Sequence, residues 1–142
     1  MSEEKKKHLG LGVMINALLG NDDSSKICSA AIGKIITELS IHENALWFTF
    51  SDGSKINFYD DGQSCCEHRY MHTDDDLKYY IGATLLGAAI KDGPTESDEW
   101  GDPKESEFLI IKTSEGEFTV VNYNEHNGYY GGFSICCKGD IK

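Results

Sequence analysis

Short apolar runs alternate with polar, glycine-containing turns over most of the chain. Three such runs, residues 32–41, 46–50 and 56–59, are rich in the β-branched and aromatic residues that are typical of strands. Asp52 and Gly53 separate the second run from the third. An Asp-Gly pair favours a tight hairpin, because glycine accepts the positive φ of the turn. The three runs therefore predict a three-stranded antiparallel meander.

The second half of the chain repeats this order of strands and turns. Residues 81–90 align with residues 32–41 at an offset of 49, and both segments begin with Ile-Gly. The strands that follow align at an offset of 63, and the extra residues match a stretch rich in glycine, proline and acid, residues 91–106. We expect this stretch to be a long surface loop. The repeat, residues 32–70 and 81–133, predicts a second three-stranded meander.

Two helices are predicted outside the strands. Apolar residues recur at helical spacing within residues 9–19, and a cap followed by carboxylates favours a short helix over residues 74–80. We therefore predict an α+β fold: two related three-stranded antiparallel β-meanders, an N-terminal helix, and a short helix between the units. Residues 1–25 would form the first helix and a linker from residue 20, and residues 26–142 a single α+β domain.

The charge of the chain excludes one class of partner. The sequence has 24 acidic side chains against 13 Lys and Arg, which leaves a net charge of −11. Binding to a phosphate backbone requires clustered cations that displace counterions, so we expect no direct contact with nucleic-acid backbone. Arg69 is the one arginine, which also excludes a clamp of several guanidinium groups.

The cysteines indicate a reducing compartment. Five cysteines are an odd number, four of them form two adjacent pairs, and no C-x-x-C spacing is present. Free thiols in a cytosol are favoured over a disulfide framework. The apolar run at residues 9–19 is too short to span a bilayer and is not followed by a small-residue cleavage site. We therefore expect no contact with a membrane.

Two polar segments, residues 59–70 and 122–133, concentrate chemically active side chains after the third strand of each predicted unit. Each segment contains a histidine, a glutamate, a glycine and flanking tyrosines. Sites on a rigid β scaffold are usually built from such connecting segments. We predict that residues 65–70 and 124–130 meet in a common pocket or patch.

The motifs in these segments resemble those of a known family. The strings DDGQSCCE at residues 60–67, RY at residues 69–70, DDDL at residues 74–77 and NEHNGYYGGF at residues 124–133 are similar to a widespread family of small bacteriophage-encoded domains of unknown function. The resemblance covers roughly residues 32–135. It implies a phage origin and action in the host bacterial cytoplasm, and it supplies no reaction.

The preferred hypothesis is a non-catalytic phage accessory protein that binds and neutralises a host component. That component would be a host protein, such as a CRISPR or other defence effector, or the small signalling nucleotide of a defence system. For a nucleotide, Arg69 would meet phosphate and a tyrosine would stack on the base. For a protein, Trp100 and the tyrosines would be anchors and the surrounding carboxylates would steer association. The candidate contact residues are Tyr59, Asp61, Arg69, Tyr70, Trp100, Asn124, His126, Asn127, Tyr129 and Tyr130.

The alternative is a metal- or cysteine-dependent hydrolase that uses Cys65, Cys66, His68 and His126. All four are zinc-ligand types, and a cysteine beside a histidine suits nucleophilic catalysis. Their spacing is not that of a recognised zinc motif, so we expect no metal and no cofactor. A homodimer is a further expectation, because the apolar stripe of residues 9–19 and exposed strand edges need cover.

Overall fold

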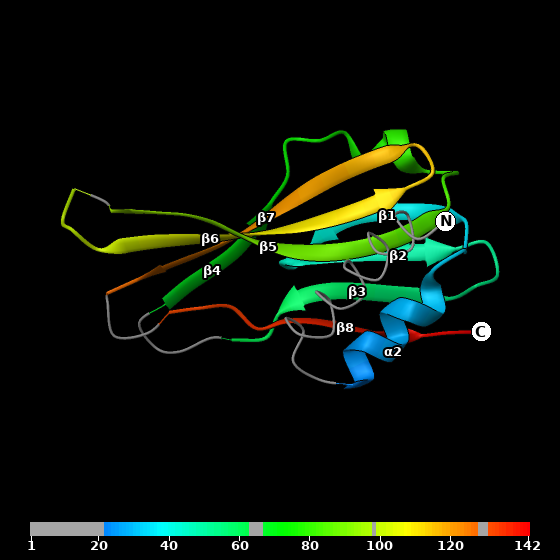
Figure 1. Cartoon of the computed structure of the whole chain (residues 1–142), viewed down its shortest axis with the longest axis horizontal. Coiled ribbons are helices and arrows are strands. Elements are labelled where there is room, and N and C mark those ends of the chain that lie inside the picture. Colours follow the sequence, from blue (N-terminus) through cyan, green and yellow to red (C-terminus); the bar gives the residue numbers. More distant parts are fainter. Residues whose placement is uncertain (1–21, 63–66, 98, 128–130) are drawn as a thin grey trace, which may run out of the picture.

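The strands of the protein form two antiparallel sheets, and a helix packs against one of them (Figure 1). The computed structural model describes residues 22–62, 67–97, 99–127 and 131–142. The elements in chain order are α2 (Asp22–Ala31), β1 (Ile36–His42), β2 (Ala45–Phe50), β3 (Lys55–Asp60), β4 (Glu67–His72), the 3-10 helix η1 (Leu77–Tyr80), β5 (Leu85–Ser97), β6 (Pro103–Thr113), β7 (Gly116–His126) and β8 (Ile135–Asp140). Strands make up most of the described chain, in agreement with the predicted combination of antiparallel sheet and helix.

Each sheet takes its fourth strand from the other half of the chain. One sheet has the order β1-β2-β3-β8 and the other β4-β7-β6-β5. β4 follows β3 in the sequence but pairs with β7, whereas β8 follows β7 and pairs with β3. Both sheets are therefore four-stranded, and neither consists of a predicted three-stranded unit alone. Because of this exchange, the polar residues of β4, which follow β3 in the chain, lie beside the end of β7.

The core lies between the apolar faces of the two sheets. Phe48 and Phe58 of one sheet and Phe118 of the other are each at most 1% exposed. Full burial of one such side chain contributes about 1.5–3 kcal/mol. On the side of β8, α2 contributes Cys28 and Ala31, which are 1% and 0% exposed. Buried and more exposed positions alternate along β6 and β7 where these strands cover the core.

The two Ile-Gly segments that the sequence aligns at an offset of 49 contact each other. The N–H of Gly33 donates to the carbonyl oxygen of Leu85 at 2.8 Å, and the N–H of Gly82 donates to that of Ile36 at 2.7 Å. The two bonds are equivalent in the alignment, because Gly33 aligns with Gly82 and Ile36 aligns with Leu85. Gly33 and Gly82 have φ values of 94° and 97°, which explains why glycine stands at both positions. The contact joins the start of β1 to the start of β5.

The acid-rich stretch at residues 91–106 is a strand hairpin and not the predicted surface loop. β5 and β6 remain paired from Leu85 opposite Thr113 to Ser97 opposite Pro103. Figure 1 shows this pair running past the other sheet, with β7 beside β6 as far as Lys104 opposite Glu125. We call residues 91–107 the arm. The prediction was wrong because glycine and proline at residues 93–94 fall in a register shift between residues 92 and 95, where a strand tolerates them.

The helical predictions have different outcomes. Residues 9–19 lie outside the described residues. Residues 22–25 were expected to belong to a linker, and instead they form the first turn of α2. The helix expected over residues 74–80 is the shorter η1, whose cap Asp76 accepts a hydrogen bond from the Lys78 N–H at 3.2 Å. Within the described ranges, no helix combines the length and the apolar character needed to cross a bilayer.

Candidate functional site

The structure brings the two polar segments together as neighbouring strands. In the pairing of β4 with β7, Arg69 lies opposite Asn124 and Tyr70 lies opposite Tyr123. These residues were expected in loops, and their position in a ladder is a correction to that expectation. Because side chains alternate along a strand, the pairing divides the candidate residues between two faces of the sheet.

The inner face holds Arg69 in a fork of two carboxylates. Its Nη1 donates to Asp60 Oδ2 at 2.7 Å, and its Nη2 donates to Glu67 Oε1 at 2.8 Å. A third bond joins Nε to Glu67 Oε2 at 3.2 Å. The exposed fractions of the side chains are 9% for Arg69, 9% for Asp60 and 1% for Glu67. A phosphate would have to displace two carboxylates to reach Arg69.

Asn124 extends this buried network. Its side chain is fully buried, and Nδ2 donates to Glu67 Oε1 at 3.2 Å and to the Gly132 carbonyl oxygen at 3.1 Å. Its Oδ1 has no hydrogen-bond partner within the described part of the chain. Asp60, at the end of β3 in the other sheet, accepts the Ser134 N–H at Oδ1 at 2.9 Å. The network therefore fastens residues 131–134 to the sheet.

His126 is fixed in the same way. Its Nε2 lies 3.0 Å from Glu105 Oε1, and the Gly132 N–H donates to the same oxygen at 2.8 Å. A Cβ on Gly131 would lie 2.8 Å from that oxygen, which explains the glycine there. The arrangement makes His126 an organiser of the segment that follows β7.

Glu107 on β6 has a raised pKa, about 7 instead of its usual 4.5, because of burial first and the neighbouring carboxylate of Asp92 second. The folded state therefore favours the protonated carboxyl. Ionisation between about pH 4.5 and 7 costs stability in the folded state, since the unfolded chain ionises at the lower value.

We expect Glu107→Gln to remove this pH dependence. Relative to the variant, the free energy of unfolding of the wild type should fall by about 1–2 kcal/mol from pH 4.5 to pH 8, a value reduced for partial exposure of the group. Urea unfolding at both pH values measures it. Glu115→Gln, at an exposed turn, is the matched control. A constant difference between wild type and Glu107→Gln across this range would contradict the prediction.

The outer face carries a cluster of rings and charges that faces solvent, which we call the outer cluster: His68, Tyr70, Lys104, Tyr123 and Glu125. The ring centroids of Tyr70 and Tyr123 lie 5.0 Å apart with an interplanar angle of 27°, and His68 lies 4.9 Å from Tyr70. Lys104 Nζ lies 4.6 Å from the centroid of Tyr123. The Tyr70 hydroxyl donates to Glu125. Burial and this carboxylate raise the pKa of Tyr70.

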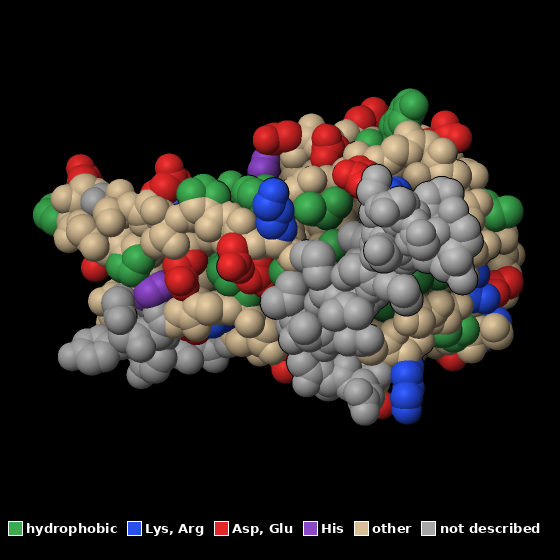
Figure 2. All heavy atoms as spheres, in the orientation of Figure 1, with side chains coloured by type: hydrophobic (Ala, Val, Ile, Leu, Met, Phe, Trp, Pro, Cys, Tyr) green, Lys and Arg blue, Asp and Glu red, His purple; other side chains and the backbone are tan. Residues whose placement is uncertain are grey.

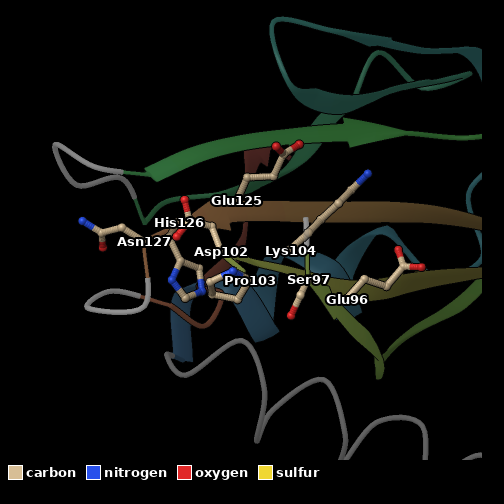
Figure 3. Close-up of a pocket in the computed structure, with 8 residues that line it drawn as sticks. All are labelled: Glu96, Ser97, Asp102, Pro103, Lys104, Glu125, His126 and Asn127. Atoms are coloured by element: carbon tan, nitrogen blue, oxygen red, sulfur yellow. The ribbon is translucent and has the colours of Figure 1, made fainter. Parts of the chain in front are cut away.

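A hollow of about 400 Å³ lies beside the outer cluster, between the arm and the end of β7 (Figure 3). It is lined by Glu96, Ser97, Asp102, Pro103, Lys104, Glu125, His126 and Asn127. Three of these side chains are carboxylates, and one is a lysine. The predicted residues His126 and Asn127 thus lie beside arm residues, of which Ser97, Pro103 and Lys104 were not among the candidates. Glu96 and Asp102 belong to the carboxylates around Trp100 that were expected to steer a protein partner.

The remaining predicted residues are distributed elsewhere. Tyr59 and Asp61 line a separate hollow of about 590 Å³ between α2 and β8, with Lys138 Nζ 5.5 Å from the Tyr59 ring centroid. Trp100 lies at the turn of the arm and is 81% exposed. Cys65, Cys66, Tyr129 and Tyr130 lie outside the described residues. The structure therefore gathers Tyr70, His126 and Asn127 beside the arm and leaves Tyr59 and Asp61 apart.

The described residues offer no clear metal centre. His68 and His126 are one position out of step in the pairing of β4 with β7, so their side chains point to opposite faces of the sheet. Among residues 22–62, 67–97, 99–127 and 131–142, no group of three or more His, Cys, Asp or Glu could hold a metal ion. Burial raises the pKa of Cys28 to about 11 and also raises that of Cys137. These two thiols are therefore poor nucleophiles.

Together these features define a small domain of two β-sheets that exchange the strands β4 and β8, with a buried polar network and a projecting arm. The chain belongs to the family described as Domain of unknown function (DUF7448), which matches residues 29–136. The match spans both polar segments and the arm. Neither a curated protein nor a solved structure matches the chain.

Proposed function

We propose that the chain is a non-catalytic binding domain that docks a basic surface of a partner protein against its arm. The observation that carries the proposal is Trp100, which is 81% exposed at the turn of a hydrogen-bonded strand pair. Most side chains of β5 beyond Ile90 are exposed and add nothing to the core. A large ring held out on a rigid strand pair is typical of an interface anchor.

The charge around this anchor supports a basic partner. Glu96, Glu99 and Asp102 are exposed near the turn of the arm, and the whole chain carries a net charge of −11. Figure 2 shows carboxylates spread along the arm. Such a field raises the rate of association with a positively charged surface and repels acidic ones.

The outer cluster is a second part of the proposed contact surface. Tyr70 and Tyr123 hold each other in place by stacking, and Lys104 and Glu125 fix their positions further. Rigid side chains lose little conformational entropy on binding, which favours affinity. Since Arg69 is held by two carboxylates, a protein partner is favoured over a nucleotide.

The proposal that the partner is a bacterial host component rests on the sequence motifs. Their resemblance to bacteriophage-encoded domains supports a phage accessory protein acting in the bacterial cytoplasm on a host component. An acidic domain of this kind would neutralise a host defence effector by covering a basic, functional surface. No catalytic step, metal or cofactor is part of this proposal.

Trp100→Ala is expected to weaken binding to the host partner about tenfold or more, because the ring is the proposed anchor. The partner is first captured on the immobilised full chain from a bacterial lysate and purified. Its Kd for wild type and variant is then measured by surface plasmon resonance. Binding to the wild type should also weaken at about 0.5 M salt, since screening removes the steering field.

Tyr79→Ala is the matched control, because Tyr79 is 62% exposed on η1 and lies outside both the arm and the outer cluster. It should leave the Kd unchanged. Equal affinity of wild type and Trp100→Ala would refute the arm as the contact surface. Turnover of a captured molecule by the purified chain would refute the non-catalytic assignment.

A further inference from the structure

β1 is an edge strand: among the described residues no second strand pairs with its middle, although η1 lies close to it. β1 has only β2 as a neighbour in the sheet order. Its start is joined to the β5 side by the bond from the Ile36 N–H to the Ala83 carbonyl oxygen, 2.9 Å. Further along, no backbone bond beyond the β2 ladder involves Leu39 or Ile41 in the described chain. Edge strands of this kind pair readily with other chains unless they are covered.

The turn between β1 and β2 determines which backbone N–H and C=O groups of β1 point away from β2. Glu43 and Asn44 have φ values of 54° and 56°, which define a two-residue turn of the I′ type between β1 and β2. In such a hairpin the flanking pair, His42 and Ala45, exchanges hydrogen bonds, and the bonded pairs then alternate along the ladder. The N–H and C=O groups of Leu39 and Ile41 therefore point away from β2.

A hollow of about 410 Å³ lies along this edge and has an apolar floor. Leu39 and Met71, at 7% and 8% exposure, are the buried members of its lining, and Ile41 and Leu77 are partly buried. The hollow runs between β1 and the segment from the end of β4 to η1. Its size and lining suit an aliphatic side chain presented by a neighbouring strand.

Two carboxylates on the rim select the charge of that strand. Asp75 and Asp76 line the hollow and are exposed. Asp75 Oδ2 accepts the Thr119 N–H at 2.9 Å, and Asp76 Oδ1 accepts the Lys78 N–H at 3.2 Å, so both side chains are held in position. Lys78 partly offsets them, yet the surrounding chain remains strongly acidic. The rim therefore favours lysine or arginine beside the aliphatic residue.

We infer that β1 and this hollow form a second binding surface, which takes an extended basic peptide segment as an added strand. The main-chain groups of Leu39 and Ile41 pair with the segment. An aliphatic side chain of the segment enters the hollow, and a flanking basic side chain meets Asp75 and Asp76. This surface is separate from the arm, so it stands or falls independently of the proposed function.

The test uses the full chain and a blocked, fluorescein-labelled peptide of seven residues in which lysine and isoleucine alternate. Fluorescence polarisation measures its Kd. Amide hydrogen exchange by NMR reports where it binds: the Leu39 and Ile41 amides should exchange fast in the free protein and become protected with the peptide. A peptide of equal charge, with its central isoleucine replaced by proline, should bind at least about tenfold more weakly, because proline cannot pair and leaves the hollow empty.

Asp76→Asn keeps the cap of η1 and removes one rim charge, so it should weaken binding of the lysine-isoleucine peptide by about two- to fivefold. Asp140→Asn removes the same charge from an exposed position on β8 and should leave the Kd unchanged. Equal binding of the two peptides, or protection that maps to the arm and not to Leu39 and Ile41, would overturn the inference. Absence of binding by the wild type would overturn it as well.

Discussion

Arg69→Ala is expected to lower the free energy of unfolding by about 3–5 kcal/mol, a large share of the stability of a domain of this size. The substitution removes the one cation between Asp60 and Glu67, whose side chains are 9% and 1% exposed. Both carboxylates would remain buried without a counter-charge, and Asn124 would lie beside them. Urea unfolding followed by tryptophan fluorescence measures the loss.

Lys34→Ala is the matched control for this prediction. It breaks the ion pair with Asp52, in which both groups are more accessible to solvent than those of the Arg69 network. Its cost should stay below about 1 kcal/mol. Arg69→Lys should fall between the two, because an ammonium keeps the charge but cannot donate to two carboxylates as a planar fork does. A loss below about 1 kcal/mol for Arg69→Ala would show that the network does not stabilise the fold.

The sequence was sufficient for local structure where one physical signal dominates. The apolar and aromatic run at residues 46–50 and the Asp52-Gly53 pair predicted the hairpin of β2 and β3, in which Gly53 has a φ of 91°. The Ile-Gly alignment placed Gly33 and Gly82 at positions with the same backbone conformation. The internal repeat as such stays a prediction. These signals are short-range, because they follow from the conformational preferences of neighbouring residues.

The sequence pattern did not predict which distant strands pair, and this pairing determines where the residues of the candidate site lie. The exchange of β4 and β8 between the sheets is set by which edges meet, and no local propensity encodes that choice. Arg69 illustrates the consequence: in isolation an arginine near polar residues suits a phosphate, but the pairing with β7 and the end of β3 surrounds it with carboxylates. The functional interpretation of a charged side chain therefore depends on its partners more than on its type.

The arm was misread for a related reason. A run of acidic residues with Gly93 and Pro94 has the composition of a loop, and its alternation is weak because both faces of its outer part are exposed. Pairing of β5 with β6 satisfies its main chain without burying its side chains. Exposed strands of this kind lack the apolar period on which strand prediction depends, so the feature that carries the proposed function was the hardest to predict.

Asn124→Asp is expected to cost about 3–4 kcal/mol at pH 8, although the side chains have nearly the same shape. The amide donates from Nδ2 to Glu67 and to the Gly132 carbonyl, and the substitution places an acceptor with negative charge against both. Arg69, opposite on β4, offsets part of this cost but already serves two carboxylates. The variant should unfold at lower urea concentration and release residues 131–134, whose amide protection reports the loss.

The pH dependence of the stability loss of Asn124→Asp distinguishes the cost of a buried charge from the cost of lost hydrogen bonds. Burial beside Glu67 raises the pKa of the introduced carboxyl above its unfolded value, so the cost of ionising it is absent at low pH and develops as the pH rises. The deficit relative to wild type should thus be smaller at pH 4.5 than at pH 8 by about 1 kcal/mol or more. Asn57→Asp, opposite Lys138 in the β3–β8 ladder, should show little deficit at either pH. A deficit for Asn124→Asp that is constant with pH would mean that lost hydrogen bonds, and not buried charge, limit what this position accepts.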